Sequence, residues 1–296
     1  MTNQIDKIYK HKDLPLNICH FNTLPSTQIW AYDNIDALVN SEKLSPNVWT
    51  VITADNMTSG IGSCDHKTHM PRTWYTVNGK SLNATYVTLR RRNQTDEPER
   101  NAQDLCLYTL GLALTVCKIL GSFGIKEPRI KWVNDIYVNG KKLGGILTKQ
   151  LDKRYVFEQV EYEPIVFGIG LNVLHDENDI PKNVESPATS IRIESLLDDS
   201  LLKIEYILER LHLEVIKTVT SMNSSRNTGF QDSVLVEINK RLLYKGSVVG
   251  VLDYERDDEV KMGVFHGIDQ NGFAIIRLPD INGELKLSHG RIRFFG

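Results

Sequence analysis

The strongest fold signal in the chain is the stretch KWVNDIYVNGKKLGGIL, residues 131–147. Asn139-Gly140 lies between two apolar runs, and this dipeptide favours the two-residue turn of a β-hairpin. A continuous ladder from that turn predicts four pairs: Val138 with Lys141, Tyr137 with Lys142, Ile136 with Leu143, and Asp135 with Gly144.

Paired residues share a face of a sheet, and faces alternate along each strand. One face of this hairpin therefore carries Lys131, Asp135, Tyr137, Lys142 and Gly144. Buried charges cost stability unless they are solvated, paired or used. Two interpretations remain open here: a half-exposed hairpin with a solvated face, or a site for an anion such as a phosphate, with Asp135 available for magnesium.

A second informative stretch is VFGIGLNV, residues 166–173. Alternation places Gly168, Gly170 and Asn172 on one face of a strand and apolar side chains on the other. Glycine weakens a strand unless something approaches its backbone closely. The pattern predicts a floor for a flat ligand, and it is not a dinucleotide fingerprint because the third glycine and the following helix are missing.

The rest of the chain predicts a mixed α/β (α+β) protein. Residues 1–25 are polar and unpatterned, Ser26 or Thr27 caps a helix to about Asn40, and residues 55–80 form a long loop. Further strands are expected at 48–54, 82–89, 130–138, 143–147, 155–160 and 165–173, and helices at 102–122, 200–222 and 234–244. About five short strands after Lys245 predict a small β-barrel. The expected domains are residues 1–240 and 245–296.

Composition narrows the function classes. Lys plus Arg total 35 and Asp plus Glu total 37 in 296 residues, a balance that argues against a dedicated nucleic-acid binder. Residues 105–123 carry one charge, and we expect a buried helix there rather than a membrane span. Cys64, His66 and His69 match no strong zinc pattern. Cysteine usage and the polar N-terminus predict a reducing, cytoplasmic location.

Together these stretches resemble the biotin protein ligases (biotin–acetyl-CoA-carboxylase ligases). The family's KWPNDxY…KKxxGIL signature appears at residues 131–137 and 141–147, and its GxGxN strand at 168–172. Its Ser-Thr-Asn helix start appears as Ser26-Thr27-Gln28, and its Ala-Thr-Ser as residues 188–190. The resemblance runs over residues 24–296 and implies a catalytic domain of the biotin/lipoate ligase type with an SH3-like C-terminal barrel.

The chain departs from the family in its glycine-rich loop, which reads Gln-x-x-Gly-Arg-Gly-Arg-x-Gly-Arg-x-Trp in the family. Met57 stands at the glutamine, and Ile61 and Ser63 stand at the first two arginines. Roughly eight extra residues then precede Arg72 and Trp74, which match the last arginine and the tryptophan. Arg72, or Lys67 and the histidines of the insertion, are the candidates to replace the missing charge.

The resemblance implies two steps: biotin and ATP form biotinyl-AMP, and a lysine of an acceptor domain then takes the biotin. ATP, Mg²⁺ and biotin are the implied small molecules. The implied catalytic residues are Lys142 and Arg72, and Asp135 is the implied magnesium ligand. The implied nucleotide contacts are Lys131, Trp132, Asn134, Asn172 and Ala188. The implied biotin contacts are Ser26, Thr27, Gln28, Met57, Gly60, Ile61, Gly62, Ser63, Trp74, Gly144, Gly145, Gly168 and Gly170.

The implied partner is a biotin carboxyl carrier protein or a carboxylase domain that bears the target lysine, and a homodimer stays open. Because 25 residues precede Ser26, we expect no DNA-binding domain and no sequence-specific DNA binding. Because residues 105–123 are expected to form a buried helix, we also expect no membrane association. Two alternatives remain: a lipoate–protein ligase with similar chemistry, and a catalytically weakened binding protein of the same fold.

Overall fold

A computed structural model describes residues 5–64, 70–92, 98–181, 186–224, 230–252, 260–279, 283–288 and 290–294. Its main feature is a large mixed sheet in the order β1-β2-β3-β6-β11-β9-β8-β7, with β10 paired to β11. The strands are β1 Lys7–Lys10, β2 Leu16–Leu24, β3 Trp49–Met57, β6 Ser81–Arg91, β7 Arg129–Lys131, β8 Asp135–Val138, β9 Lys141–Gln150, β10 Tyr155–Phe157 and β11 Val160–Asn172.

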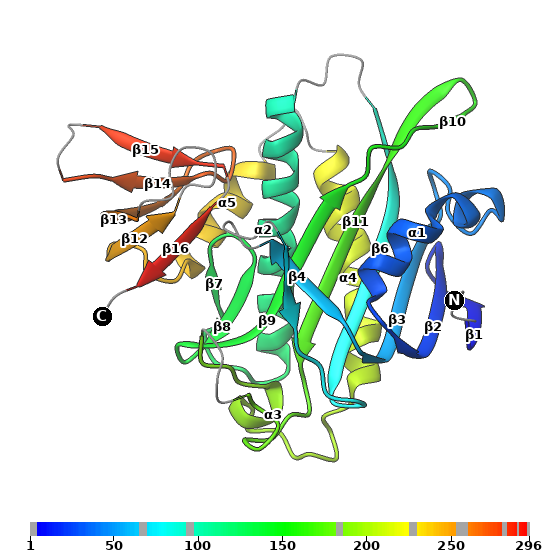
Figure 1. The fold of residues 1–296 in the computed structure, drawn as a ribbon, viewed down its shortest axis with the longest axis horizontal. Helices are drawn as coiled ribbons and strands as arrows, with labels where there is room; N and C mark the ends of the chain where they lie inside the picture. The colour runs from blue at the N-terminus through cyan, green and yellow to red at the C-terminus, as the bar shows by residue number, and fades with distance from the viewer. Residues whose placement is uncertain are drawn as a thin grey trace.

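Helices cover the two faces of this sheet unequally. α2 (Pro98–Ser122) and α4 (Ile204–Ser224) pack on one face, where Phe167, Ile169 and Leu171 of β11 enter the main core. α1 (Thr27–Asn40) packs on the other face, against Val166 of β11. A short hairpin of β4 (Gly60–Cys64) and β5 (Pro71–Trp74) lies beside α1, in front of the central strands (Figure 1). The second face is therefore covered in part by a helix and in part by a hairpin.

The C-terminal unit is a five-stranded antiparallel sheet in the order β15-β14-β13-β12-β16. Its strands are β12 Val248–Leu252, β13 Lys261–Ile268, β14 Ala274–Arg277, β15 Glu284–Leu287 and β16 Arg291–Phe294. It lies at the left in Figure 1, next to α5 (Phe230–Arg241) and α2. The five strands and their antiparallel order are consistent with the small SH3-like barrel predicted from the sequence.

The two sheets share one core, because Gly272 of the C-terminal unit sits against α2. A side chain on Gly272 would meet Leu110 at 2.9 Å and Cys106 at 3.1 Å. The Gly272 carbonyl accepts hydrogen bonds from the Cys106 thiol (3.2 Å) and from the Trp132 indole nitrogen (3.0 Å). The C-terminal unit is thus held against the turn between β7 and β8.

Several elements agree with the sequence prediction. Ser26 caps α1, and its hydroxyl accepts the Ile29 N–H at 3.4 Å. The helix at 102–122 is long and apolar enough to cross a bilayer, but 72% of its most apolar 18-residue stretch is buried within the fold. The prediction of a buried helix is confirmed. The expected helices at 200–222 and 234–244 are α4 and α5, with boundaries shifted by a few residues.

Two expectations about the N-terminal third are wrong. Residues 1–25 contain β1 and β2, and β2 is a buried strand parallel to β3. Residues 55–80 contain the β4–β5 hairpin instead of an uninterrupted loop. Both faces of β2 are buried: Leu16 and Ile18 lie in one core, and Phe21 and Leu24 lie in the other. A strand buried on both faces lacks the alternation of apolar and polar residues that marks a half-buried strand.

The expected strand at 130–138 is also divided. Residues 132–134 turn the chain, so that β7 and β8 form a hairpin with Ile130 opposite Ile136 and Lys131 opposite Asp135. A short helix, α3 (Ile191–Glu194), was not predicted. Its sequence of four residues is too short for helical periodicity to be visible.

We predict that Trp132 stabilises the junction between the two sheets. Trp132→Ala should lower the free energy of unfolding by about 3–5 kcal/mol, the usual cost of deleting a buried tryptophan. Trp132→Phe should cost about 1 kcal/mol, because the hydrogen bond to Gly272 is lost. Urea denaturation measures both. Trp30→Phe, at a half-buried position on α1, is the control. Wild-type stability in Trp132→Ala would contradict this role.

Candidate functional site

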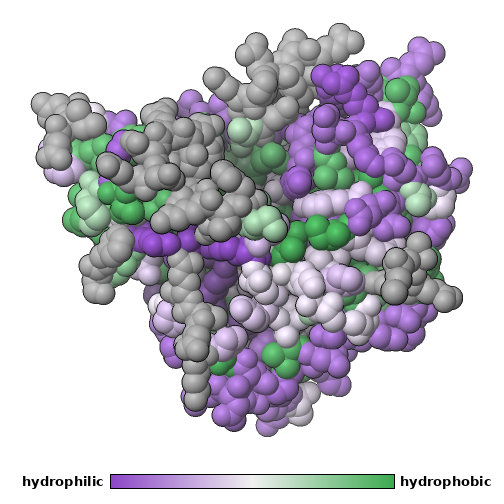
Figure 2. Space-filling view, viewed as in Figure 1, coloured by the Kyte–Doolittle hydropathy of each residue, from purple (hydrophilic) through white to green (hydrophobic). Residues whose placement is uncertain are grey.

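A cavity of about 420 Å³ opens between the central strands and the β4–β5 hairpin. In Figure 2 the middle of this face is nearly white, which marks residues of intermediate hydropathy. The predicted site residues that line the cavity are Ser26, Thr27, Gln28, Met57, Ile61, Gly62, Ser63, Arg72, Trp74, Lys131, Asn134, Asp135, Lys142, Gly145, Gly168, Gly170, Asn172 and Ala188. Their roles toward a ligand stay predictions.

Three of the predicted contact residues, Gly60, Trp132 and Gly144, do not line the cavity. Gly60 lies against the other strand of its hairpin, and a side chain there would meet the Trp74 carbonyl at 2.5 Å. Trp132 is 4% exposed and points into the shared core, where it donates to Gly272. Sequence alternation could not place Trp132 because it assumed an uninterrupted strand.

The floor of the cavity is made by β11 and β6 side by side. Gly168 pairs with Thr85, Gly170 with Asn83, and Asn172 with Ser81. Paired residues point to the same side, so a glycine row and a polar row run along the floor together. The predicted facing of the GxGxN strand is confirmed, since Phe167, Ile169 and Leu171 lie in the opposite core.

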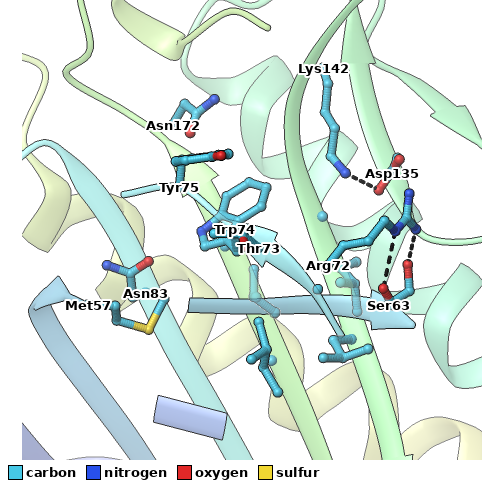
Figure 3. A pocket seen from close by; sticks show the side chains of 18 of the residues that line it. Met57, Ser63, Arg72, Thr73, Trp74, Tyr75, Asn83, Asp135, Lys142 and Asn172 are labelled. Carbon is cyan, nitrogen blue, oxygen red and sulfur yellow. Dashed lines mark hydrogen bonds and ion pairs between the residues drawn. The ribbon is translucent and has the colours of Figure 1, made fainter. Parts of the chain in front are cut away.

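The glycines make room for two side chains of this protein. The space above Gly168 holds the Gln28 amide, and the space above Gly170 holds the Trp74 indole, whose ring atoms lie 2.8–2.9 Å from where a side-chain carbon would begin. Figure 3 shows this indole in the middle of the site, between Asn83 on one side and Lys142 on the other. Trp74 therefore divides the cavity into two ends.

One end carries positive charge. The Lys142 ammonium lies 2.6 Å from the Asp135 carboxylate and 5.6 Å from the centre of the Trp74 ring. Lys131, opposite Asp135 in the ladder, donates to the Tyr137 hydroxyl at 3.4 Å. Burial raises the pKa of Tyr137 to about 12, so this hydroxyl stays neutral beside the lysine. Two lysines and one carboxylate of the described chain thus meet at this end of the cavity.

The register of the β8–β9 hairpin explains which glycine faces this charge. The pairs of Val138 with Lys141 and of Tyr137 with Lys142 are confirmed. Beyond them the ladder shifts by one residue, so Asp135 pairs with Gly145 and Ile136 with Gly144. The predicted pairing of Asp135 with Gly144 is wrong, because β9 has one extra residue at this point. Beyond the extra residue, each side chain of β9 points to the opposite face from the one that a regular ladder predicts.

Arg72 reaches the same end from β5. Its guanidinium donates to the Ser63 carbonyl at 3.1 Å and also to the Ser63 hydroxyl (Figure 3). The hairpin thus orients the one arginine that matches the family pattern of the loop. Lys67, His66 and His69, the other candidates for charge, lie outside the described residues.

The opposite end is a closed network of short polar side chains. Thr27 donates its N–H (3.4 Å) and its hydroxyl (3.6 Å) to the Met57 sulfur. The Thr85 hydroxyl donates to Thr27 (2.9 Å) and to the Gln28 carbonyl oxygen (3.4 Å). The Gln28 amide nitrogen donates to the Tyr32 hydroxyl (2.8 Å) and to a backbone carbonyl (3.1 Å). These groups satisfy one another.

The two predicted asparagines hold backbone segments around the charged end. The Asn172 amide donates to the Thr189 carbonyl at 2.9 Å, and the Asn134 amide donates to the Ile146 carbonyl at 3.0 Å. The Lys142 backbone N–H donates to Pro187, and the Thr189 N–H donates to Lys142. The segment that contains Ala188 is thereby fixed beside Lys142.

Several lining residues escaped the sequence analysis: Asn83, Thr85, His175, Asp179 and Arg291. Asn83 and Thr85 had a signal, since polar residues at every second position of a strand mark an uncovered face. Arg291 comes from the C-terminal sheet, and only tertiary structure brings it here. Burial lowers the pKa of His175, which keeps its imidazole neutral.

Unpartnered polar atoms gather in this cavity. Among the side chains that the structure describes, three buried nitrogen or oxygen atoms have no hydrogen-bond partner: Trp74 Nε1, Asn83 Oδ1 and His175 Nδ1. All three residues line the cavity. Leaving a buried polar atom unpaired is costly, and such atoms in one cavity indicate a place where a ligand or water completes them.

Within the described parts of the chain, no group of three or more histidine, cysteine, aspartate or glutamate residues is arranged to hold a metal ion. Asp135 is engaged by Lys142, and Asp179 by Lys80 at 2.6 Å. The donor set does not suit a metal held by protein alone, which needs several oxygen ligands.

Comparisons with known proteins agree on one family. Residues 42–162 match the model of the biotin/lipoate A/B protein ligase family. The bifunctional ligase/repressor BirA of Bacillus subtilis is 32% identical over 175 residues, which cover 59% of this chain and 46% of that protein. Biotin–protein ligase 2 of Arabidopsis thaliana is 32% identical over 111 residues, or 34% of this chain and 32% of that protein. The chain thus spans less than half the length of these relatives.

Solved structures extend the likeness of fold over nearly the whole chain. The biotin protein ligase from Aquifex aeolicus, determined in complex with biotin and ATP, covers 93% of this chain and 97% of its own, with a TM-score of 0.63 and 20% identity. The biotin protein ligase from Leishmania major, in complex with biotinyl-5-AMP, gives a TM-score of 0.52 at 18% identity, with 94% and 98% covered. The predicted fold class, a mixed-sheet domain with a small C-terminal β unit, is confirmed.

We predict unequal effects of alanine substitution at the two adjacent glycines of β9. In Gly144→Ala the new carbon would meet Leu171 at 2.5 Å and the Gly170 carbonyl at 2.6 Å, so stability should fall by about 1–3 kcal/mol. In Gly145→Ala the nearest atom is an Asp135 oxygen at 3.3 Å in the cavity, and stability should change by less than about 1 kcal/mol. Urea denaturation compares the two. Equal losses would contradict the shifted register.

Proposed function

We propose that the chain is an ATP-dependent biotin protein ligase. The proposal starts from the match of residues 42–162 to the model of the biotin/lipoate A/B protein ligase family. In this proposal it forms biotinyl-5'-AMP and transfers biotin to a lysine of a carrier domain. The observation that carries the proposal is the cavity geometry: a glycine floor under Trp74 leads directly to the paired Lys142 and Asp135. An acid bound in the cavity beside Trp74 would bring its carboxylate to the lysine.

The first step needs positive charge at the point where carboxylate and phosphate meet. A biotin carboxylate oxygen attacks the α-phosphorus of ATP, the bond to the β-phosphate breaks, and pyrophosphate leaves. Two anions approach each other in this step, and fixed cations lower its barrier. In this proposal Lys142 holds the carboxylate and the α-phosphate, and Lys131 holds phosphate oxygens on the same face. Arg72, oriented by Ser63, supplies a third cation from the hairpin.

The second step uses the same site without ATP. The amine of an acceptor lysine attacks the acyl carbon of the mixed anhydride, an amide bond forms, and AMP leaves with the bonding electrons. The amine loses its proton to solvent or to a nearby base. The anhydride must be protected from water until then, and the β4–β5 hairpin with Trp74 covers the floor where it would lie.

Magnesium enters this proposal as part of the substrate, in the form of the magnesium complex of ATP. Magnesium usually keeps several waters and is held by one or two carboxylates together with substrate phosphates. Asp135 is the carboxylate nearest to the proposed phosphate position, where it already balances Lys142. Asn134, Asn172 and Ala188 form the wall beside it, and we assign the nucleoside to that side.

The proposed partner is a biotin carboxyl carrier protein or a carboxylase domain with an exposed lysine. The family model includes lipoate enzymes, but the curated relatives named above are a biotin ligase and a ligase/repressor. Lipoate is therefore the less supported acid. ATP–pyrophosphate exchange tests the choice directly: exchange that depends on biotin supports the proposal, and exchange with lipoate alone would overturn it.

We predict that Lys142→Ala lowers the rate of biotin-dependent pyrophosphate exchange by at least about a hundredfold, the scale of losing one fixed transition-state donor. Lys141→Ala is the matched control, because Lys141 precedes it on β9 and is exposed to solvent. The control should keep near-normal exchange. Near-normal exchange by Lys142→Ala would remove Lys142 from the mechanism.

A further inference from the structure

Asn83, at the centre of the cavity floor, has an amide whose orientation is determined by its surroundings. It is 4% exposed, and its side-chain nitrogen lies 3.3 Å from the Ala54 carbonyl oxygen of β3. A carbonyl oxygen can only accept, so the nitrogen must face Ala54. The Asn83 carbonyl oxygen therefore faces the other way, and it is one of the three buried side-chain atoms without a partner in the described chain.

The polar side chains at the end of the cavity opposite Lys142 already form hydrogen bonds with one another. Thr27 and Met57 bind each other, and Thr85 donates to Thr27 and Gln28. Both amide hydrogens of Gln28 have acceptors, the Tyr32 hydroxyl and a backbone carbonyl. A ligand that entered here would have to break this network to hydrogen-bond with it. The Asn83 oxygen is an acceptor that the network leaves available.

A donor lies beside this acceptor. Asn83 pairs with Gly170 in the ladder, and the Trp74 indole covers Gly170 with its Nε1 atom 2.9 Å from the position of a side-chain carbon. Trp74 Nε1 is buried and also has no partner. The floor thus presents one acceptor and one donor in neighbouring positions (Figure 3). The third unpartnered atom is on His175, whose other ring nitrogen forms a hydrogen bond of 3.3 Å with the Ser81 hydroxyl.

We infer that Asn83 determines specificity for the acid substrate by accepting a hydrogen bond from an N–H of its head group, with the Trp74 N–H donating to the adjoining carbonyl. This inference rests on the proposed function and names the residue that selects the acid. A ureido ring offers an N–H next to a C=O and completes both atoms. A dithiolane or an alkyl chain offers neither and would leave both atoms buried and unpaired.

The test measures ATP–pyrophosphate exchange by Asn83→Ala with biotin, desthiobiotin, lipoate and octanoate as acids. Loss of one buried hydrogen bond should raise the KM for biotin and desthiobiotin about ten- to a hundredfold. The KM for ATP should stay the same, and the KM for lipoate and octanoate should stay the same or fall. The variant would therefore lose its preference for ureido acids, a change that general loosening of the fold would not produce.

Asn17→Ala is the matched control. Asn17 is also 4% exposed, and its amide nitrogen likewise donates to a backbone carbonyl, that of Lys43 at 2.8 Å, but it does not line the cavity. It should lose stability without a change in acid preference. Asn83→Val, which suits a strand and offers no hydrogen-bond acceptor, serves if the alanine variant does not fold.

The outcomes separate the two proposals. A biotin KM within twofold of wild type in Asn83→Ala or, if that variant does not fold, in Asn83→Val overturns the role of Asn83 while the ligase assignment stands. Equal rises for biotin and octanoate also overturn it, because they indicate a structural role. If the wild-type chain shows no biotin-dependent exchange, the proposed function falls and the assignment of Asn83 falls with it.

Discussion

The site depends on the unequal coverage of the two faces of β11. On one face Phe167, Ile169 and Leu171 pack under α2 and α4, and this burial supplies the hydrophobic stabilisation that holds the strand in the middle of the sheet. On the other face Val166 packs under α1, and then Gly168 and Gly170 follow. A strand anchored on one side can do without side chains on the other, and the space that these glycines leave is filled by Gln28 and by Trp74, which bring both side chains into the site.

The charged end depends on a small irregularity in β9. The one-residue shift after Tyr137 turns Gly145 toward the cavity and Gly144 into the packing against β11. Each glycine then meets a separate need: Gly144 allows two strands to approach, and Gly145 leaves space for Asp135 and Lys142. A regular ladder would exchange these roles and place Gly144 opposite Asp135. Bulges near active sites commonly redirect side chains in this way.

Much of this could be predicted from sequence because local rules decide it. The Asn139-Gly140 turn, the cap at Ser26 and the facing of Gly168 and Gly170 each follow from a few adjacent residues. The exceptions depend on distant contacts. β2 is buried on both faces and so lacks alternation, and Trp132 turns toward Gly272, which lies 140 residues further along the chain. Arg291 reaches the cavity from a separate sheet.

The end of the cavity away from the charge shows how substitutions change a site without removing it. A methionine at position 57 accepts from Thr27 through sulfur, which is a weak acceptor, and a glutamine at position 28 fills the space over Gly168. Both changes engage groups of the chain with one another and reduce the polar atoms left for a ligand. Asn83 of β6 keeps a buried carbonyl oxygen outside that network. In the role that we propose for Asn83, selectivity for an acid moves from a loop to the rigid floor beneath it, where strand pairing holds the acceptor in place.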